Sequence, residues 1–145
     1  MCEKSKKAEA LFAGGFNCAQ SVLGAFCEDY GLEIAAAFKV SAGLGGGVRM
    51  GEICGAASGA ALVIGLKYGQ FPAGDKDAKA FCNSKVAEFM AAFKARNRSV
   101  VCREILGLDV SVPEEYAAAQ ERNLFKTTCA DMVRGAAELL LKLGY

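Results

Sequence analysis

The stretch that decides the fold is Asn17-Cys-Ala-Gln-Ser-Val-Leu-Gly-Ala-Phe-Cys-Glu-Asp-Tyr-Gly31. Asn17 is a good N-cap, and Gly31 is a residue that commonly ends a helix. Between them, apolar residues recur every three or four positions, which is the spacing of one helix face. This stripe consists of Ala19, Val22, Leu23, Phe26, Cys27 and Tyr30. The stretch therefore predicts an amphipathic helix from Cys18 to Tyr30.

The same period recurs along the rest of the chain, and the alternation typical of strands is nearly absent. Further helices are predicted over Lys4–Phe12, Ile34–Ala42, Glu52–Tyr68, Asp75–Asn97 and Val101–Leu106, in a short segment from Val112-Pro113, and in a last helix capped by Thr127 or Thr128 and ending at Leu143. The sequence contains no linker, repeat or low-complexity tract. We therefore expect an all-α fold, a compact bundle of five to seven helices, with residues 1–145 as a single domain.

Composition excludes several classes of function. The 145 residues carry 17 Lys+Arg against 16 Asp+Glu, whereas nucleic-acid binding requires a basic footprint. Histidine is absent, so there is no imidazole base, no His ligand and no C-x-x-C-H site, and we expect no haem. The longest apolar stretch, Ile53–Leu66, is too short for a membrane span, which needs about 20 residues. The N-terminal segment has no apolar core of a secretory signal. We expect a cytoplasmic protein whose thiols are mostly reduced.

Cysteine carries most of the chemical signal, with seven residues in the chain. Four of them, Cys18, Cys54, Cys102 and Cys129, fall at predicted helix starts. Exposed N–H groups and the helix dipole favour an anion there, so we expect lowered thiol pKa values and good nucleophiles or metal ligands. The other three are set aside: Cys27 lies on an apolar stripe, Cys82 inside a long helix and Cys2 in the N-terminal tail.

Glycine marks a second candidate element. Gly47, Gly51, Gly55 and Gly59 recur every four residues, which predicts a smooth helix ridge for close packing. The bare backbone at Gly45, Gly46, Gly47 and Gly55 can present N–H groups to a thiolate, a cluster sulfur or a small anion, and Arg49 adds positive charge. We take these five residues as candidate cofactor-binding positions. The glycine- and alanine-rich faces also make a homodimer an expectation.

The motifs resemble those of a known family. Gly15-Phe-Asn-Cys18-Ala-Gln-Ser-Val is similar to the opening of the C_GCAxxG_C_C family, and Gly45-Gly-Gly-Val-Arg-Met-Gly-Glu-Ile-Cys54-Gly-Ala-Ala-Ser-Gly-Ala resembles its central motif. Cys102-Arg-Glu-Ile-Leu-Gly107 and Cys129 resemble its third and fourth cysteines, so the resemblance extends over about residues 5–143. It implies a redox-active protein that uses these four cysteines, and it supplies no settled reaction, substrate or redox partner.

Three functions remain open at this point. The four cysteines can act as catalytic thiols that exchange with disulfides, with Arg103 helping to hold the Cys102 thiolate. They can instead be the ligands of an iron–sulfur cluster or another metal. In the third alternative they are core residues of a helical adaptor. Because the chain contains no C-x-x-C, either kind of site exists only if the fold gathers four distant segments.

Overall fold

The computed structural model describes residues 2–145, and this part of the chain is all-helical, without a named strand. It contains eight α-helices: α1 (Glu3–Ala13), α2 (Cys18–Phe26), α3 (Ile34–Ser41), α4 (Gly55–Tyr68), α5 (Lys76–Asn97), α6 (Cys102–Leu106), α7 (Pro113–Glu121) and α8 (Ala130–Lys142). The fold class is confirmed, and the expected count of five to seven is slightly low. The two short segments predicted after α5 form separate helices, α6 and α7. Pro113 is the first residue of α7, where the N–H group that proline lacks would have no partner within the helix.

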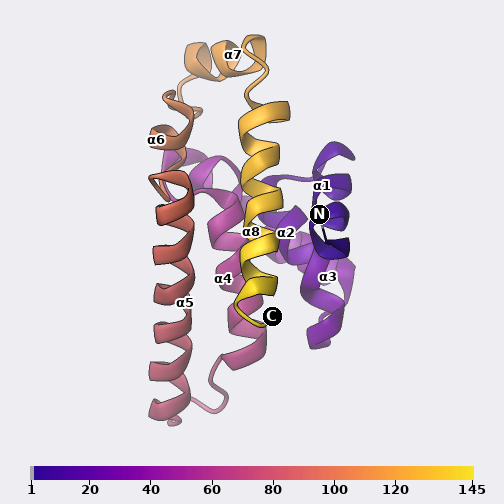
Figure 1. The fold of residues 1–145 in the computed structure, drawn as a ribbon, viewed down its shortest axis with the longest axis vertical. Helices are drawn as coiled ribbons and strands as arrows, with labels where there is room; N and C mark the ends of the chain where they lie inside the picture. Colours follow the sequence, from indigo (N-terminus) through magenta and orange to yellow (C-terminus); the bar gives the residue numbers. More distant parts are fainter. Residues whose placement is uncertain (1) are drawn as a thin grey trace.

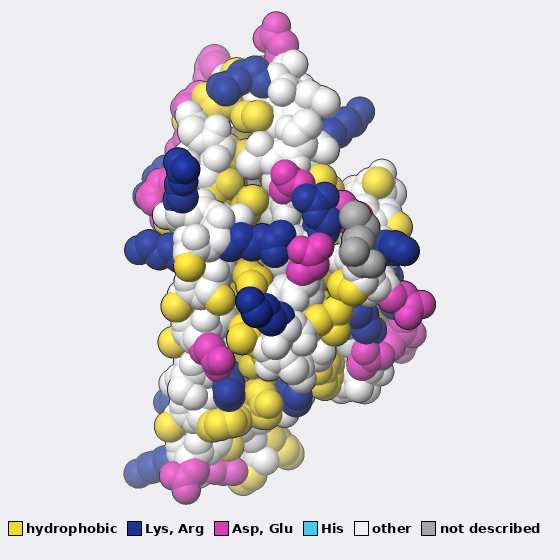
Figure 2. Space-filling model, viewed as in Figure 1, with side chains coloured by type: hydrophobic (Ala, Val, Ile, Leu, Met, Phe, Trp, Pro, Cys, Tyr) yellow, Lys and Arg dark blue, Asp and Glu magenta, His cyan; other side chains and the backbone are white. Residues whose placement is uncertain are grey.

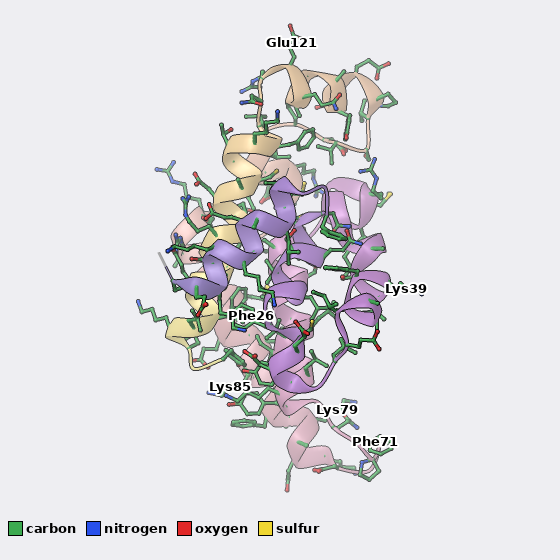
Figure 3. The ribbon with its side chains drawn as sticks, turned by 90° about the vertical axis from the view of Figure 1, so that its right-hand side faces the viewer. Phe26, Lys39, Phe71, Lys79, Lys85 and Glu121 are labelled. Carbon is green, nitrogen blue, oxygen red and sulfur yellow. The ribbon has the colours of Figure 1, made fainter. Side chains whose placement is uncertain are left out.

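α4, α5 and α8 run along the long axis of the molecule (Figure 1). α4 and α5 form a hairpin whose turn lies at the lower end of the view, and α8 packs against both of them. α2 lies at the centre, in contact with α1, α3, α4 and α8, while α7 lies across the upper end. Phe71, in the α4–α5 turn, points away from the body and is 95% exposed (Figure 3).

Local sequence signals explain the boundaries of α2. The Asn17 side chain accepts a hydrogen bond from Gln20 N, and the Gln20 side chain accepts one from Asn17 N, both at 2.9 Å. This capping box fixes the predicted start at Cys18. The end differs from the prediction, because the chain tightens into a 3₁₀ turn over Cys27–Tyr30 before Gly31 adopts a left-handed φ of +80°. The predicted stripe is nevertheless buried from Ala19 through Cys27.

Two hydrophobic clusters of unequal size form the interior. The larger one joins α1, α2, α4, α5 and α8 around Phe26, Phe89 and Phe93, all fully buried. Phe26 lies among these helices in the side view (Figure 3). The smaller one lies under α6 and α7 and contains only four buried residues, Cys102, Leu106, Val110 and Ala119. The α6–α7 region therefore sits on the bundle as a cap with its own small core.

The prediction of a helical glycine ridge holds for Gly55 and Gly59 and is wrong for Gly47 and Gly51. Gly55 and Gly59 do lie on α4, where a Cβ at Gly59 would come within 2.7 Å of Ala19 O, so the backbones of α2 and α4 approach closely. Gly47 and Gly51 do not lie on α4, because both belong to the tight turn before it and have left-handed φ values of +63° and +66°. α4 consequently begins at Gly55 and not at Glu52 as predicted.

The start of the last helix also differs from the prediction. Neither threonine caps α8, since a π-helical turn over Phe125–Cys129 (η4) leads directly into it. Thr127 Oγ1 instead donates to Asn123 O at 2.9 Å, a bond within the preceding turn.

Lys and Arg side chains alternate with Asp and Glu over the face shown in Figure 2, in keeping with the near-zero net charge. None of the helices within residues 2–145 has the length and apolar character needed to cross a membrane.

Candidate functional site

A cavity of about 780 Å³ lies near the end of the bundle where α1 ends and where α2, α4 and α8 begin. Its wall draws on both hydrophobic clusters, with Cys18 and Cys54 from the side of the larger one and Cys102 and Cys129 from the smaller. All four cysteines singled out from the sequence therefore line one space, although 27 or more positions separate each from the next along the chain.

An isolated antiparallel bridge between Ile53 and Val101 holds two of the cysteines. Cys54 N donates to Val100 O at 2.7 Å, and Cys102 N donates to Glu52 O at 2.6 Å. In such a pair, adjacent side chains point to opposite faces, so Cys54 and Cys102 share the face opposite Ile53. Ile53 is 37% exposed, while both cysteines are buried and line the cavity. The bridge thus joins segments 48 residues apart with their sulfurs on one side.

Cys18 lies directly against the start of α4. It is the first residue of α2, immediately after the Asn17 cap. A Cβ at Gly55 would overlap Cys18 Sγ and come within 3.2 Å of Ala19 N, so only glycine leaves room for the sulfur. As whole residues, Cys18 and Cys129 are partly buried, whereas Cys54 and Cys102 are buried.

Cys129 does not occupy a free helix start. It closes the η4 turn, its N–H donates to Leu124 O at 3.0 Å, and its φ and ψ of −66° and −38° are helical. The helical run therefore begins upstream at Phe125, and the free N–H groups that were expected around Cys129 lie elsewhere.

The expected lowering of the thiol pKa values is wrong for all four cysteines. Burial raises the pKa of Cys18, although the backbone N–H groups of Gly46, Ala19 and Gly55 lower it in part. Burial likewise raises the pKa of Cys54, and the N–H groups of Ala56 and Ala57 offset this only partly. Helix-start N–H groups are thus present at these two sulfurs, but removal from water outweighs them.

The four sulfurs also act on one another. Burial, together with the charge of Cys18, raises the pKa of Cys102 to about 11 and that of Cys129 to about 12. The charge of Cys18 also raises the pKa of Cys54, as does that of Cys102. Cys18 and Cys102 are therefore within electrostatic reach of each of the other three, and the reduced cavity holds protonated thiols at neutral pH.

The cation that faces the cysteines is Arg49 and not Arg103. Positive charge on Arg49 lowers the pKa of Cys102, and the Arg49 guanidinium lies 5.7 Å from the centre of the Tyr116 ring. Arg103 instead pairs with Glu52 at 2.6 Å and donates to Gly51 O at 3.1 Å. Val48 and Arg49 both have a φ of +58°, a strained backbone for a β-branched and a long side chain.

Four of the five proposed cofactor positions line the cavity, namely Gly45, Gly46, Arg49 and Gly55. Gly47 does not. A Cβ at Gly47 would come within 2.8 Å of Glu52 O. Glycine at this position therefore lets the backbone of Glu52 pack closely against the same turn.

The three cysteines set aside do not line the cavity. Cys27 is fully buried in the larger cluster, as predicted. Cys82 is partly buried against the same cluster. Cys2 is the N-cap of α1, because its sulfur accepts a hydrogen bond from Ser5 N at 3.3 Å.

Sequence reasoning missed the remaining wall of the cavity. Aromatic rings of Phe12, Phe16, Tyr116 and Phe125 line it, together with the charged side chains of Glu9 and Lys126. Each of these residues resembles an ordinary core or surface residue in its own segment. No local pattern could have singled them out, because they come from separate elements.

No three His, Cys, Asp or Glu side chains among residues 2–145 lie close enough together to hold one metal ion, and all the described cysteines are free thiols. A mononuclear tetrahedral site needs sulfurs at about 2.3 Å from the ion, which the present spacing does not provide.

A comparison with curated proteins and one with solved structures return no match. A family model described as "Putative redox-active protein (C_GCAxxG_C_C)" matches residues 16–143, a span that contains the four cavity cysteines and excludes Cys2. This span is nearly the whole chain, and the chain therefore belongs to the C_GCAxxG_C_C family.

Proposed function

We propose that this protein is a thiol redox protein in which cysteines of the cavity cycle between dithiol and disulfide. The observation that carries the proposal is that Cys18, Cys54, Cys102 and Cys129 line one cavity and influence one another electrostatically. Membership of a family described as redox-active supports the same class of function.

The exchange reaction needs one attacking and one resolving cysteine. A cavity thiolate attacks a sulfur of an organic disulfide, forms a mixed disulfide and releases one thiolate of the substrate. A second cavity thiolate then attacks the protein sulfur of the mixed disulfide and releases the other. Two protein thiols are oxidised to one disulfide, the substrate disulfide is reduced to two thiols, and the two protons pass to the products.

Cys18 is the best candidate for the attacking thiol. As a residue it is less buried than Cys54 and Cys102, and the backbone N–H groups of Gly46 and Gly55 favour its charged form, whereas at Cys102 the favourable influence is the charge of Arg49. Cys54 and Cys102 are buried beside it and suit the resolving step.

Thiol titration before and after treatment with diamide tests the proposal. We expect seven free thiols in the reduced protein and a loss of two or four on oxidation, with peptide mapping placing every disulfide among the cavity cysteines. Cys82→Ser is the matched control and should not change the number lost. If the four cavity thiols never pair, the redox proposal fails, and the adaptor alternative then explains them as core residues.

The second candidate function is an iron–sulfur cluster, or another site of several metal atoms, on the same four cysteines. Four thiols around one cavity, with backbone N–H groups at Cys18 and Arg49 near Cys102, match the donor set of a cluster. A cluster distributes its cysteines over several irons and so accepts wider sulfur spacing than a single ion. Anaerobic reconstitution followed by iron analysis and a visible spectrum tests it, and a folded, colourless, metal-free product would rule it out.

A further inference from the structure

The cavity has the size and lining of a small-molecule site. Its volume of about 780 Å³ falls within the range of about 300–1,000 Å³ that is typical of ligand pockets. Rings from α1, α7 and η4 contribute to the wall, namely Phe12, Tyr116 and Phe125. The side chains of Ile105 and Met132 add to the apolar surface. An aliphatic or aromatic body of a ligand would be desolvated there at little cost.

The charged side chains that line the cavity are positive on balance. Three charged side chains line it, Glu9, Arg49 and Lys126. Glu9 pairs with Arg134 at 3.3 Å, but Asp131 shares the same guanidinium, so Glu9 keeps part of its negative charge and is outnumbered by the two cations. Among the described residues, neither Arg49 nor Lys126 forms an ion pair. Both are exposed, so two uncompensated cations border a mostly apolar space.

Asp109 is a further carboxylate near the cysteines, and the positive charge of Arg103 acts on it. Asp109 raises the pKa of Cys102 and so lies within electrostatic reach of it. Its carboxylate accepts hydrogen bonds from Ser111 N at 2.9 Å and from Ser111 Oγ at 2.6 Å. Asp109 is not part of the cavity wall, and within residues 2–145 it forms no ion pair with Arg49.

We propose that the cavity binds a small organic anion, with its apolar body against the aromatic wall and its carboxylate near Arg49 and Lys126. A ligand in this position lies beside the four sulfurs. If the protein has the proposed redox function, its reaction partner is therefore a small carboxylate-bearing organic disulfide, reduced to two thiols as the protein thiols form one disulfide.

Binding is tested with a probe that cannot react with thiols. 2-Naphthoate is titrated with the reduced protein, and the change in its naphthalene fluorescence gives the Kd. The uncharged 2-naphthamide is titrated in the same way as a probe of the same shape. We expect 2-naphthoate to bind at least about fivefold more tightly, a difference of about 1 kcal/mol. Arg49→Met and Lys126→Met should each remove much of this preference, and two separate variants keep the test decisive if one of them does not fold.

Lys94→Met is the matched control, because Lys94 is exposed on α5 outside the cavity. It should leave the affinity for both probes unchanged. Equal binding of the two probes, no binding of either, or the same loss in Lys94→Met as in Arg49→Met would each overturn the proposal.

Reaction with disulfides tests the second part. The rate at which the protein thiols react with 5,5′-dithiobis(2-nitrobenzoate), a dianionic aromatic disulfide, is measured first. It is divided by the rate of their reaction with neutral 4,4′-dithiodipyridine at the same pH. This ratio should fall about fivefold or more in Arg49→Met and stay constant in Lys94→Met. If 2-naphthoate binds as expected but the cysteines never form a disulfide, only the redox function fails. If the cysteines pair without any preference for the anionic reagent, only the ligand assignment fails.

Discussion

Replacing Gly55 by alanine tests the packing of Cys18 against α4, on which the geometry of the cavity depends. The new Cβ would overlap Cys18 Sγ, and it would lie 3.2 Å from Ala19 N and 3.3 Å from Leu44 O. The two backbone atoms cannot move without shifting α2 or the turn before α4. Overpacking of this kind costs about 1–3 kcal/mol, so we expect Gly55→Ala to lower the free energy of unfolding by that amount.

Gly65 provides the matched control on the same helix. A Cβ at Gly65 meets no atom within 4 Å. Gly65→Ala should therefore raise the free energy of unfolding by about 0.5–1 kcal/mol through helix propensity alone. The two alanine variants should differ by about 1.5–4 kcal/mol in urea denaturation under reducing conditions.

A double-mutant cycle assigns the effect to the sulfur. In a Cys18→Ala background the overlap with Sγ is gone, and Gly55→Ala should cost at least about 1 kcal/mol less than in the parent protein. Equal costs in the two backgrounds, or a Gly55→Ala protein as stable as Gly65→Ala, would refute the placement of Cys18 against Gly55.

The pKa directions and the capping box of α2 lead to four further predictions. Because the pKa values of Cys102 and Cys129 are raised to about 11 and about 12, their alkylation by iodoacetamide should increase about tenfold per pH unit from pH 7 to beyond pH 10, and a plateau near pH 9 would contradict this. The unfolded chain loses these protons first, so the free energy of unfolding should fall by about 1.4 kcal/mol per pH unit per thiol between pH 9 and the folded pKa of each thiol, measured by urea denaturation. Arg49→Met should raise the pKa of Cys102 in the same alkylation assay. Arg103→Met removes the pair with Glu52 and the hydrogen bond to Gly51 O and should leave the pKa of Cys102 unchanged; equal effects of the two variants would refute the assignment of Arg49 as the cation at the site. Asn17→Ala should cost about 1–2 kcal/mol through loss of the capping box, and a thermal midpoint equal to that of the parent would show that the cap does not hold α2.

Much of the fold could be predicted because helix signals are local. The N-cap at Asn17 and the stop at Gly31 lie within one stretch of the chain, and the apolar period between them was enough to place α2. Predictions failed where a turn competes with a helix of similar sequence. The 3₁₀ turn over Cys27–Tyr30 and the π turn over Phe125–Cys129 carry no distinct residue pattern, and packing of neighbouring elements decides between them and a regular helix.

The candidate site was predictable only as a set of residue types. Placing Cys18, Cys54 and Cys102 at helix starts needs only neighbouring residues, and the structure agrees. Whether those starts lower the thiol pKa depends on how much water reaches the sulfur. Burial between two hydrophobic clusters reverses the expected direction, and burial is a property of the whole fold.

The sequence by itself determined that the chain is helical, that histidine chemistry is absent and that four cysteines deserve priority, since each of these rests on composition or on spacing within one segment. Only the tertiary structure decided that the four sulfurs share one cavity, that Arg49 faces them in place of Arg103, and that their reduced forms are protonated. The bridge between Ile53 and Val101 shows the physical reason. Its two hydrogen bonds join backbone segments 48 residues apart, and such a long-range pairing is fixed by the energy of the whole packed chain.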